Sequence, residues 1–185
     1  MGLIGQLRAD IRQLERVYDL PSEPGVLPKP GSDTSRAQLA KVALGHDGYK
    51  VLVFTRLREA ARRSPIPGVN HLLRLAGSIL FSVEVGNGVV IGTGTDFVHT
   101  LGTVVGGTSV LGERVRLLGN NTLGTAKGNG CPVIGDDVVI GCGARILGPV
   151  TVGAGAFIGA NAVVVSDVPA GAVAVGIPAT VHSQR

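Results

Sequence analysis

One feature of this 185-residue sequence constrains its fold more than any other: apolar residues recur at six-residue steps from residue 85 onward. The series slips by two residues after Phe97 and is interrupted over roughly 125–133. Thirteen positions carry it, and all are apolar: Val85, Ile91, Phe97, Val105, Leu111, Leu117, Leu123, Ile134, Ile140, Ile146, Val152, Ile158 and Val164. Self-similarity at a fixed short period is typical of repeat proteins, in which each unit stacks on its neighbours.

Glycine marks the turn in most of these units. It is the next residue at nine of the thirteen positions: Gly86, Gly92, Gly106, Gly112, Gly124, Gly135, Gly141, Gly153 and Gly159. Six residues fit one short strand and one tight turn, and three such units make a triangular coil of about 18 residues. We expect the branched residue to point inward and the glycine to supply the positive φ of each corner. The sequence therefore predicts a mainly β fold, a parallel β-helix of a little over four coils at residues 81–170.

Residues 1–80 predict a small α-helical segment instead. Leu3, Leu7, Ile11 and Leu14 recur at four- and three-residue steps among arginines, which indicates an amphipathic helix that ends before Pro21. The other expected segments are a proline-rich loop over 21–31, helices over 34–45, 49–63 and 69–80, and a C-terminal tail over 171–185.

The charge is concentrated in the helical segment, with 12 Lys or Arg and 7 Asp or Glu in residues 1–80 against 5 and 6 in residues 81–185. This basic segment lacks the interleaved aromatic residues of a nucleic-acid interface, so we expect its arginines to form a solvated helical face and no nucleic acid to bind. No apolar run is long enough to span a membrane, and charged residues soon follow Leu3 and Ile4, unlike a signal peptide. We therefore expect a cytoplasmic protein.

The two cysteines, Cys131 and Cys142, have no CxxC spacing and no neighbours that would complete a metal cluster. They are expected to be reduced thiols. A metal-dependent β-helix enzyme is also disfavoured, because such a site needs about three histidines and the repeats contain only His99. We expect no metal site.

Several segments resemble one family closely. They are Val83-Glu-Val-Gly-Asn-Gly, Ile91-Gly-Thr-Gly-Thr-Asp-Phe-Val-His99, Ile134-Gly-Asp-Asp-Val-Val-Ile-Gly141 and Gly176-Ile-Pro-Ala179. The repeat resembles the left-handed β-helix acyltransferases, and within them the serine O-acetyltransferase family. The resemblance implies a left-handed β-helix and an enzyme that transfers an acetyl group from acetyl-CoA to an acceptor hydroxyl.

The resemblance also implies a catalytic pair. His99 matches the family's general base, and Glu84, 15 residues earlier, matches the carboxylate that orients it, usually an Asp in the serine enzymes. An alcohol is a poor nucleophile at neutral pH, so a base must take its proton during attack on the thioester. A carboxylate on the other imidazole nitrogen selects the tautomer and stabilises the imidazolium. Fifteen residues is nearly one coil, so we expect the pair on neighbouring coils at about the same corner.

The CoA site of the family is a groove between two adjacent β-helices, lined by residues small enough for the pantetheine arm to reach the backbone. The resemblance places it at Gly124, Thr125, Ala126, Cys142, Gly159 and Ala160. Phe157 stands where the family has a lysine. Because the groove is shared, the resemblance implies a homotrimer with an intersubunit site, and possibly a dimer of trimers paired through the helical segments.

The acceptor side departs from the serine enzymes. Val98 replaces an Asp beside the base, and Gly130 and Cys131 replace an Arg–His pair in the loop. A guanidinium supplies much of the binding energy for a carboxylate, so we expect free serine to bind weakly unless another basic residue, such as Lys127, replaces it. The polar candidates for acceptor binding are Asp96, Asn120, Asn121, Lys127 and Asn129.

Four interpretations follow from these departures. The first is an acetyl-CoA-dependent O-acetyltransferase that acts on a small polar acceptor. The second is serine O-acetyltransferase itself, with an altered acceptor site. The third is a polysaccharide or sugar O-acetyltransferase, because the segment Cys131-Pro-Val-Ile-Gly135 resembles the polysaccharide acetyltransferases of the same superfamily. The fourth is a non-catalytic trimeric scaffold, against which the presence of His99 argues.

Overall fold

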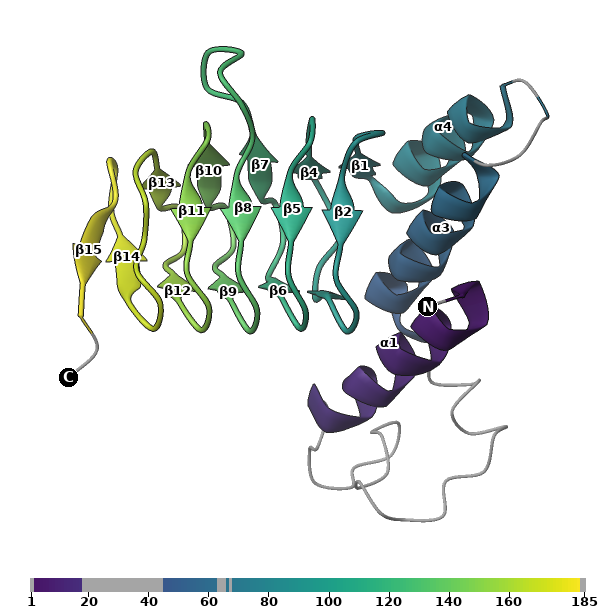
Figure 1. Ribbon diagram of the computed structural model, residues 1–185, viewed down its shortest axis with the longest axis horizontal. Coiled ribbons are helices and arrows are strands. Elements are labelled where there is room, and N and C mark those ends of the chain that lie inside the picture. Colours follow the sequence, from purple (N-terminus) through teal and green to yellow (C-terminus); the bar gives the residue numbers. More distant parts are fainter. Residues whose placement is uncertain (1, 18–44, 63–65, 67, 184–185) are drawn as a thin grey trace.

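The computed structural model describes residues 2–17, 45–62, 66 and 68–183 (Figure 1). Its helices are α1 (Leu3–Val17), α3 (Asp47–Ala61) and α4 (Val69–Phe81), within two residues of the segments expected at 49–63 and 69–80. The expected loop over 21–31 and all but the last residue of the expected helix over 34–45 lie outside the described residues.

The β-helix consists of short strands that stack into three sheets. Face A contains β1 (Val83–Val85), β4 (Thr103–Val105), β7 (Thr122–Gly124), β10 (Arg145–Leu147) and β13 (Val163–Val164). Face B contains β2 (Val90–Ile91), β5 (Val110–Leu111), β8 (Val133–Ile134) and β11 (Thr151–Val152). Face C contains β3 (Asp96–Phe97), β6 (Arg116–Leu117), β9 (Val139–Ile140), β12 (Phe157–Ile158), β14 (Val173–Val175) and β15 (Thr180–His182). The predicted fold class, a left-handed parallel β-helix behind a small helical segment, is confirmed.

The coil is longer than expected. A parallel bridge from Val168 to Val152 continues face B, and β14 pairs in parallel with β12, so the described residues complete about five turns rather than a little over four. Among the described strands only β15 runs antiparallel, on the outer edge of β14. The segment expected to be a tail from residue 171 therefore contains the last strand of the coil and a strand that covers its end.

The core is the inward column of the six-residue series. All thirteen predicted apolar positions are 4% exposed or less. Small and β-branched residues four positions later, such as Val115, Ala144 and Ala162, are equally buried. Each fully buried branched side chain contributes roughly 1.5–3 kcal/mol relative to exposure, so the aliphatic column stabilises the coil without large rings.

The glycines after the apolar positions do not work as expected. None of the nine has a positive φ. In six turns the left-handed residue comes two positions after the glycine, because the turn needs positive φ at its later position. These residues are Gly94, Arg114, Asp137, Gly143, Gly155 and Asn161. The glycine itself permits close stacking: a Cβ on Gly92 would lie 2.2 Å from the carbonyl oxygen of Gly112.

The helices cover the N-terminal end of the β-helix, whereas β15 closes the other end (Figure 1). Helix α3 lies on β3, where a Cβ on Gly48 would meet the carbonyl oxygen of Phe97 at 2.2 Å. Helix α1 contacts α3, and the buried Asp10 accepts hydrogen bonds from Arg56 Nε (3.2 Å) and from the backbone N–H of Gly94 (2.7 Å). One carboxylate therefore joins α1, α3 and the first coil.

The expected solvated face of arginines is therefore wrong for two of them, since Arg56 and Arg58 are 1% and 3% exposed. Arg58 donates to the carbonyl oxygen of Val85 (2.8 Å) and to Asn87 Oδ1 (3.1 Å). Burial lowers the pKa of its guanidinium. A buried guanidinium needs acceptors, and here the first coil supplies them.

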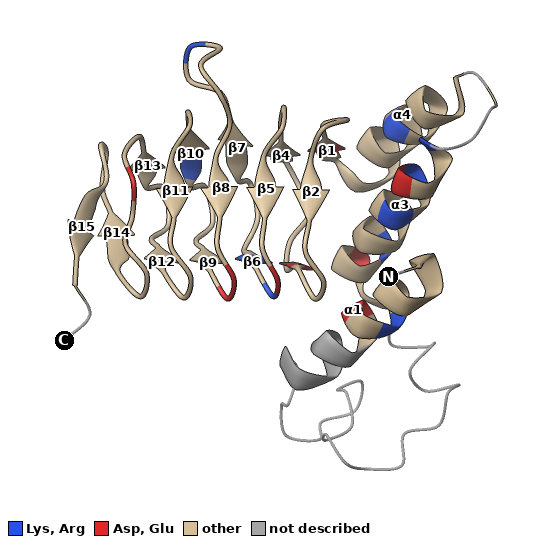
Figure 2. Cartoon of the chain, in the orientation of Figure 1, with Lys and Arg blue, Asp and Glu red and all other residues tan. Residues whose placement is uncertain are grey.

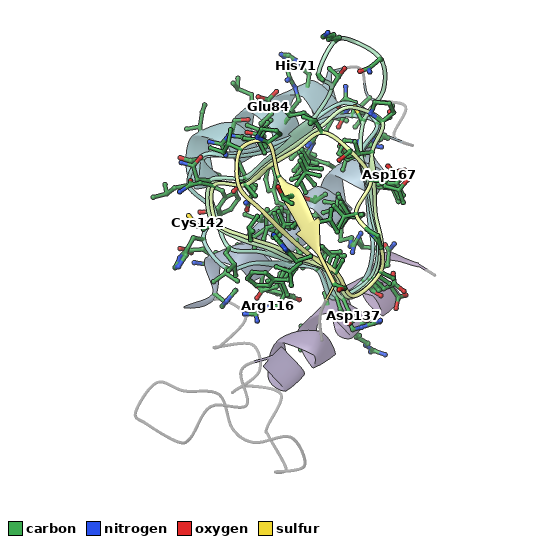
Figure 3. The ribbon with its side chains drawn as sticks, turned by 90° about the vertical axis from the view of Figure 1, so that its left-hand side faces the viewer. His71, Glu84, Arg116, Asp137, Cys142 and Asp167 are labelled. Carbon is green, nitrogen blue, oxygen red and sulfur yellow. The ribbon has the colours of Figure 1, made fainter. Side chains whose placement is uncertain are left out.

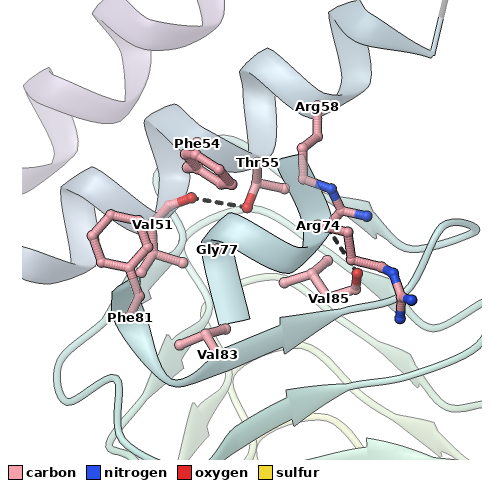
Figure 4. A pocket seen from close by; sticks show the side chains of 9 residues that line it. All are labelled: Val51, Phe54, Thr55, Arg58, Arg74, Gly77, Phe81, Val83 and Val85. Atoms are coloured by element: carbon pink, nitrogen blue, oxygen red, sulfur yellow. Dashed lines mark hydrogen bonds between the residues drawn. The ribbon is translucent and has the colours of Figure 1, made fainter. Parts of the chain in front are cut away.

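A small cavity lies between α3, α4 and β1 (Figure 4). Thr55 Oγ1 donates to the carbonyl oxygen of Val51 (2.9 Å) at one side of it. Gly77 lets the ring of Phe54 approach, because a Cβ there would lie 2.9 Å from that ring. At about 10 Å³ the cavity is no larger than one water molecule, so this junction is a packing contact rather than a ligand site.

Candidate active site

The corner between faces C and A forms one edge of the β-helix, which we call the His99 edge. It contains, coil by coil, His99, Asn120, Cys142 and Ala160, which follow β3, β6, β9 and β12. Backbone hydrogen bonds connect successive corners, for example from Asn120 N–H to the carbonyl oxygen of Leu101 (3.2 Å). Looking along the coil, Figure 3 shows Cys142 at this corner and Asp137 at another.

His99 is exposed on its edge. Gly119 of the next coil has φ +118°, and a Cβ there would lie 2.8 Å from the Cβ of His99. Only glycine at that position leaves room for the histidine. Within the part of the chain that the structure describes, the imidazole forms no hydrogen bond, so its tautomer is not fixed by this single chain.

Glu84 lies on β1 of face A, with 53% of its side chain exposed. Its Oε1 accepts a hydrogen bond from Arg74 Nη1 of α4 at 3.3 Å, and no hydrogen bond joins it to His99 among the described residues. Glu84 lies at the start of the first coil and His99 near its end. His99 comes just before β4, and β4 stacks on β1 with Val104 opposite Glu84. The pair is therefore at one end of face A, but the expected carboxylate–imidazole bond is not made.

The expected cofactor residues divide between two edges. Gly124, Thr125 and Ala126 lie at the end of β7 and in the loop that leads to β8, at the corner between faces A and B, which we call the loop edge. Cys142, Gly159 and Ala160 lie on the His99 edge. Face A separates these two groups, and the loop projects from the coil (Figure 1). A single chain does not bring the two groups together.

The expected acceptor residues are also dispersed. Asp96 is 3% exposed beneath α3, and its Oδ2 lies 3.8 Å from Arg116 Nε. Asn121 is fully buried and joins two coils by accepting from Gly119 N–H (3.1 Å) and donating to the Gly141 carbonyl (2.7 Å).

The other three acceptor candidates, Asn120, Lys127 and Asn129, are exposed. Lys127 is on the projecting loop, where Asn129 Oδ1 accepts from its backbone N–H at 3.4 Å. Asn120 is on the His99 edge, with φ +51°, and its Oδ1 accepts from Arg145 at 2.8 Å. Of the exposed candidates, only Asn120 shares an edge with His99.

Sequence reasoning missed a groove beside this edge. Its volume is about 470 Å³, and Asp47, Lys50, Leu80, Phe81, Ser82, Thr100 and Leu101 line it. Three separate elements meet there: the first turn of α3, the end of α4 and the corner after β3. The only local signal was an acid and a base three residues apart, which is common on helix surfaces.

Comparisons with known proteins place the chain in a family. The model of the bacterial transferase hexapeptide family (six repeats) matches residues 131–166. A serine acetyltransferase of Helicobacter pylori is 36% identical over 142 residues, which are 75% of this chain and 83% of that protein. The chain belongs to the serine acetyltransferase family. The Mycobacterium tuberculosis serine acetyltransferase is 43% identical over 123 residues, but this chain spans only 54% of its length.

Solved structures of this family share the fold. The serine acetyltransferase of Neisseria gonorrhoeae superposes with a TM-score of 0.80 at 28% identity over 98% of this chain and 65% of that one. Soybean serine acetyltransferase complexed with serine gives 0.79 at 31% identity, over 98% and 70%. The family resemblance expected from the motifs is thus confirmed.

Two further findings bear on the site. No described helix has the length and apolar character needed to cross a membrane. In the ranges covered by the structure, no group of three or more His, Cys, Asp or Glu side chains is arranged to hold a metal ion.

Proposed function

We propose that this protein is an acetyl-CoA-dependent O-acetyltransferase that moves an acetyl group to a hydroxyl of a small polar acceptor. The observation that carries the proposal is His99, an exposed histidine on the edge of a β-helix of the serine acetyltransferase family. Relatives of this fold have been solved in complex with serine and with CoA. Acetyl-CoA is the co-substrate of the proposed reaction.

In the proposed reaction His99 is the general base. Its neutral imidazole takes the hydroxyl proton while the acceptor oxygen forms a bond to the thioester carbonyl carbon. The bond from that carbon to the CoA sulfur then breaks, and the imidazolium returns the proton to the departing thiolate. Glu84 orients the ring and stabilises the imidazolium once its carboxylate turns from Arg74 toward His99.

The proposed site is completed by a second copy of the chain. Half of the expected cofactor residues lie on the loop edge and half on the His99 edge, with face A between them. In a homotrimer, the His99 edge of one copy faces the loop edge of its neighbour. Small residues such as Ala126 and Ala160 leave the backbone accessible to a pantetheine arm, although Phe157 lacks the charge of the family lysine.

Two alternatives remain for the acceptor. Serine acetylation proper is favoured by the relatives, which are serine acetyltransferases. A sugar acceptor is favoured by the loop, where Gly130 packs toward Pro149 and Cys131 Sγ lies against Gly107, so neither residue offers a charge to a carboxylate.

The test is release of CoA thiol from acetyl-CoA with the purified protein. The panel holds L-serine, L-homoserine, ethanolamine and glucose, each with an acceptor-free control. Release that depends on one of the hydroxyl compounds supports the proposal, and the preferred compound names the class. Thiol release that no hydroxyl acceptor increases above the control would contradict it and favour the scaffold interpretation.

A further inference from the structure

The groove of about 470 Å³ beside the His99 edge has the properties of a small-molecule site. Ligand sites of this kind usually have volumes of about 300–1,000 Å³, mostly apolar walls and a few convergent polar groups. Here Leu80, Phe81 and Leu101 supply the apolar wall. Asp47 and Lys50 supply the charge.

The groove reaches the corner that carries His99, because Thr100, the next residue along the chain, lines it. That corner is fixed in place by a hydrogen bond from Gly102 N–H to the carbonyl oxygen of Ser82 (3.1 Å). Ser82 itself lines the groove and ends α4. A molecule held in the groove therefore lies beside the corner that carries the proposed base.

The charged groups form a pair with unused bonding capacity. Lys50 Nζ donates to Asp47 Oδ1 at 2.8 Å, and their side chains are 37% and 69% exposed. This hydrogen bond holds the pKa of Asp47 below its ordinary value, so the carboxylate is ionised near neutral pH. Among the described residues, two ammonium donors of Lys50 and the second carboxylate oxygen of Asp47 have no further partner, so they can bind a second pair of opposite charges.

We propose, on the basis of the proposed function, that Asp47 and Lys50 recognise the acceptor by binding the ammonium and the carboxylate of a small hydroxy-amino acid. An α-amino acid carries these groups on one carbon, so they can lie antiparallel to the Asp47–Lys50 pair while the hydroxyl extends toward His99. The groove thus takes over the role of the family's Arg–His pair, in whose place this chain has Gly130 and Cys131. It also assigns the carboxylate to Lys50 rather than to Lys127.

Steady-state kinetics with separate acceptors tests both charges. Lys50→Met should raise the KM for L-serine about 10-fold or more, the effect of losing one charge-assisted hydrogen bond, and change the KM for acetyl-CoA less than about 2-fold. Lys50→Arg should restore most of the affinity. Ethanolamine has no carboxylate, so its KM should respond to Asp47→Asn but not to Lys50→Met.

Arg114→Met is the matched control, since it removes an exposed ion pair at the corner between faces B and C. The same KM for L-serine in Lys50→Met, Arg114→Met and wild type would overturn the inference and leave the proposed function standing. If wild type transfers acetyl to no acceptor, the proposed function fails. Calorimetric titration with L-serine then tests separately whether the groove binds an amino acid. Binding by wild type that is lost in Lys50→Met supports the inference, and unchanged or undetectable binding overturns it.

Discussion

At the residue scale, one corner shows how a side chain can occupy a position that favours glycine. Arg114 has φ +56° at the corner between faces B and C. Its Nε and Nη2 donate to the two carboxylate oxygens of Asp137 in the next coil, at 2.7 and 2.8 Å. The bidentate contact joins two coils and lowers the pKa of Asp137. Charged side chains are otherwise sparse on the β-helix and more frequent on the helices (Figure 2).

This contact predicts a pH-dependent stability. A carboxylate whose pKa is lowered in the folded state stabilises it above the unfolded-state pKa, and that contribution is lost as the pH falls through the folded-state pKa. Asp137→Asn should lower the free energy of unfolding by less than about 1 kcal/mol at neutral pH, because the pair is exposed. Urea unfolding should show this difference shrinking below about pH 4, near the ordinary Asp pKa. A difference in unfolding free energy between wild type and Asp137→Asn that stays constant down to pH 2 would contradict this role of the Arg114–Asp137 contact.

At the scale of the elements, the repeat could be predicted in detail because one apolar residue in six determines each strand. The docking of the helices could not. The sequence presents Asp10 and Arg56 as ordinary polar positions of amphipathic helices, and only the folded chain shows that they meet in the core. Gly48 likewise gives no local sign that α3 crosses the coil there. Contacts between distant segments leave no periodic signal.

The close stacking of the turn glycines on the next coil gives a prediction at the scale of the elements. Gly92→Ala places a Cβ 2.2 Å from the backbone of the next coil, whereas a Cβ at Gly106 would lie 3.4 Å from the carbonyl oxygen of Leu123, an ordinary contact. Both have negative φ, so conformational strain does not separate them. Thermal unfolding at equal protein concentration should show Gly92→Ala destabilised by about 1–3 kcal/mol, as for other overpacked sites, and Gly106→Ala near wild type. Equal midpoints would show that the close stacking is not what requires glycine.

At the scale of the whole molecule, the candidate site was predictable only in part. His99 stands in the segment that best matches the family, so the sequence alone was enough to nominate it as the candidate base. The groove joins residues from around 47, 80 and 100, and no motif connects these positions. The burial of Asp96 could not be foreseen either, because a polar residue on an outward strand position becomes buried only when a helix covers it. Asn121 is buried for another reason, since its side chain bonds the backbone of its own corner and of the next coil.

The separation of the His99 edge from the loop edge predicts that the chain forms an oligomer. Sedimentation velocity should give a mass of three or six chains, because a single chain keeps its two groups of cofactor residues on opposite sides of face A. Dilution into monomers should abolish turnover. A fully active monomer would contradict the intersubunit site while leaving the fold unaffected.

The central claim is that His99 is the base in acetyl transfer, and one comparison tests it most directly. Thiol release by wild type and His99→Ala is measured with saturating acetyl-CoA and the best acceptor, and acetyl-CoA affinity is measured separately. Loss of a general base should lower kcat about 10²–10⁴-fold, and the affinity should stay within a few-fold because no cofactor contact is removed. Turnover by His99→Ala close to that of wild type would leave the proposed reaction without its base and contradict the claim.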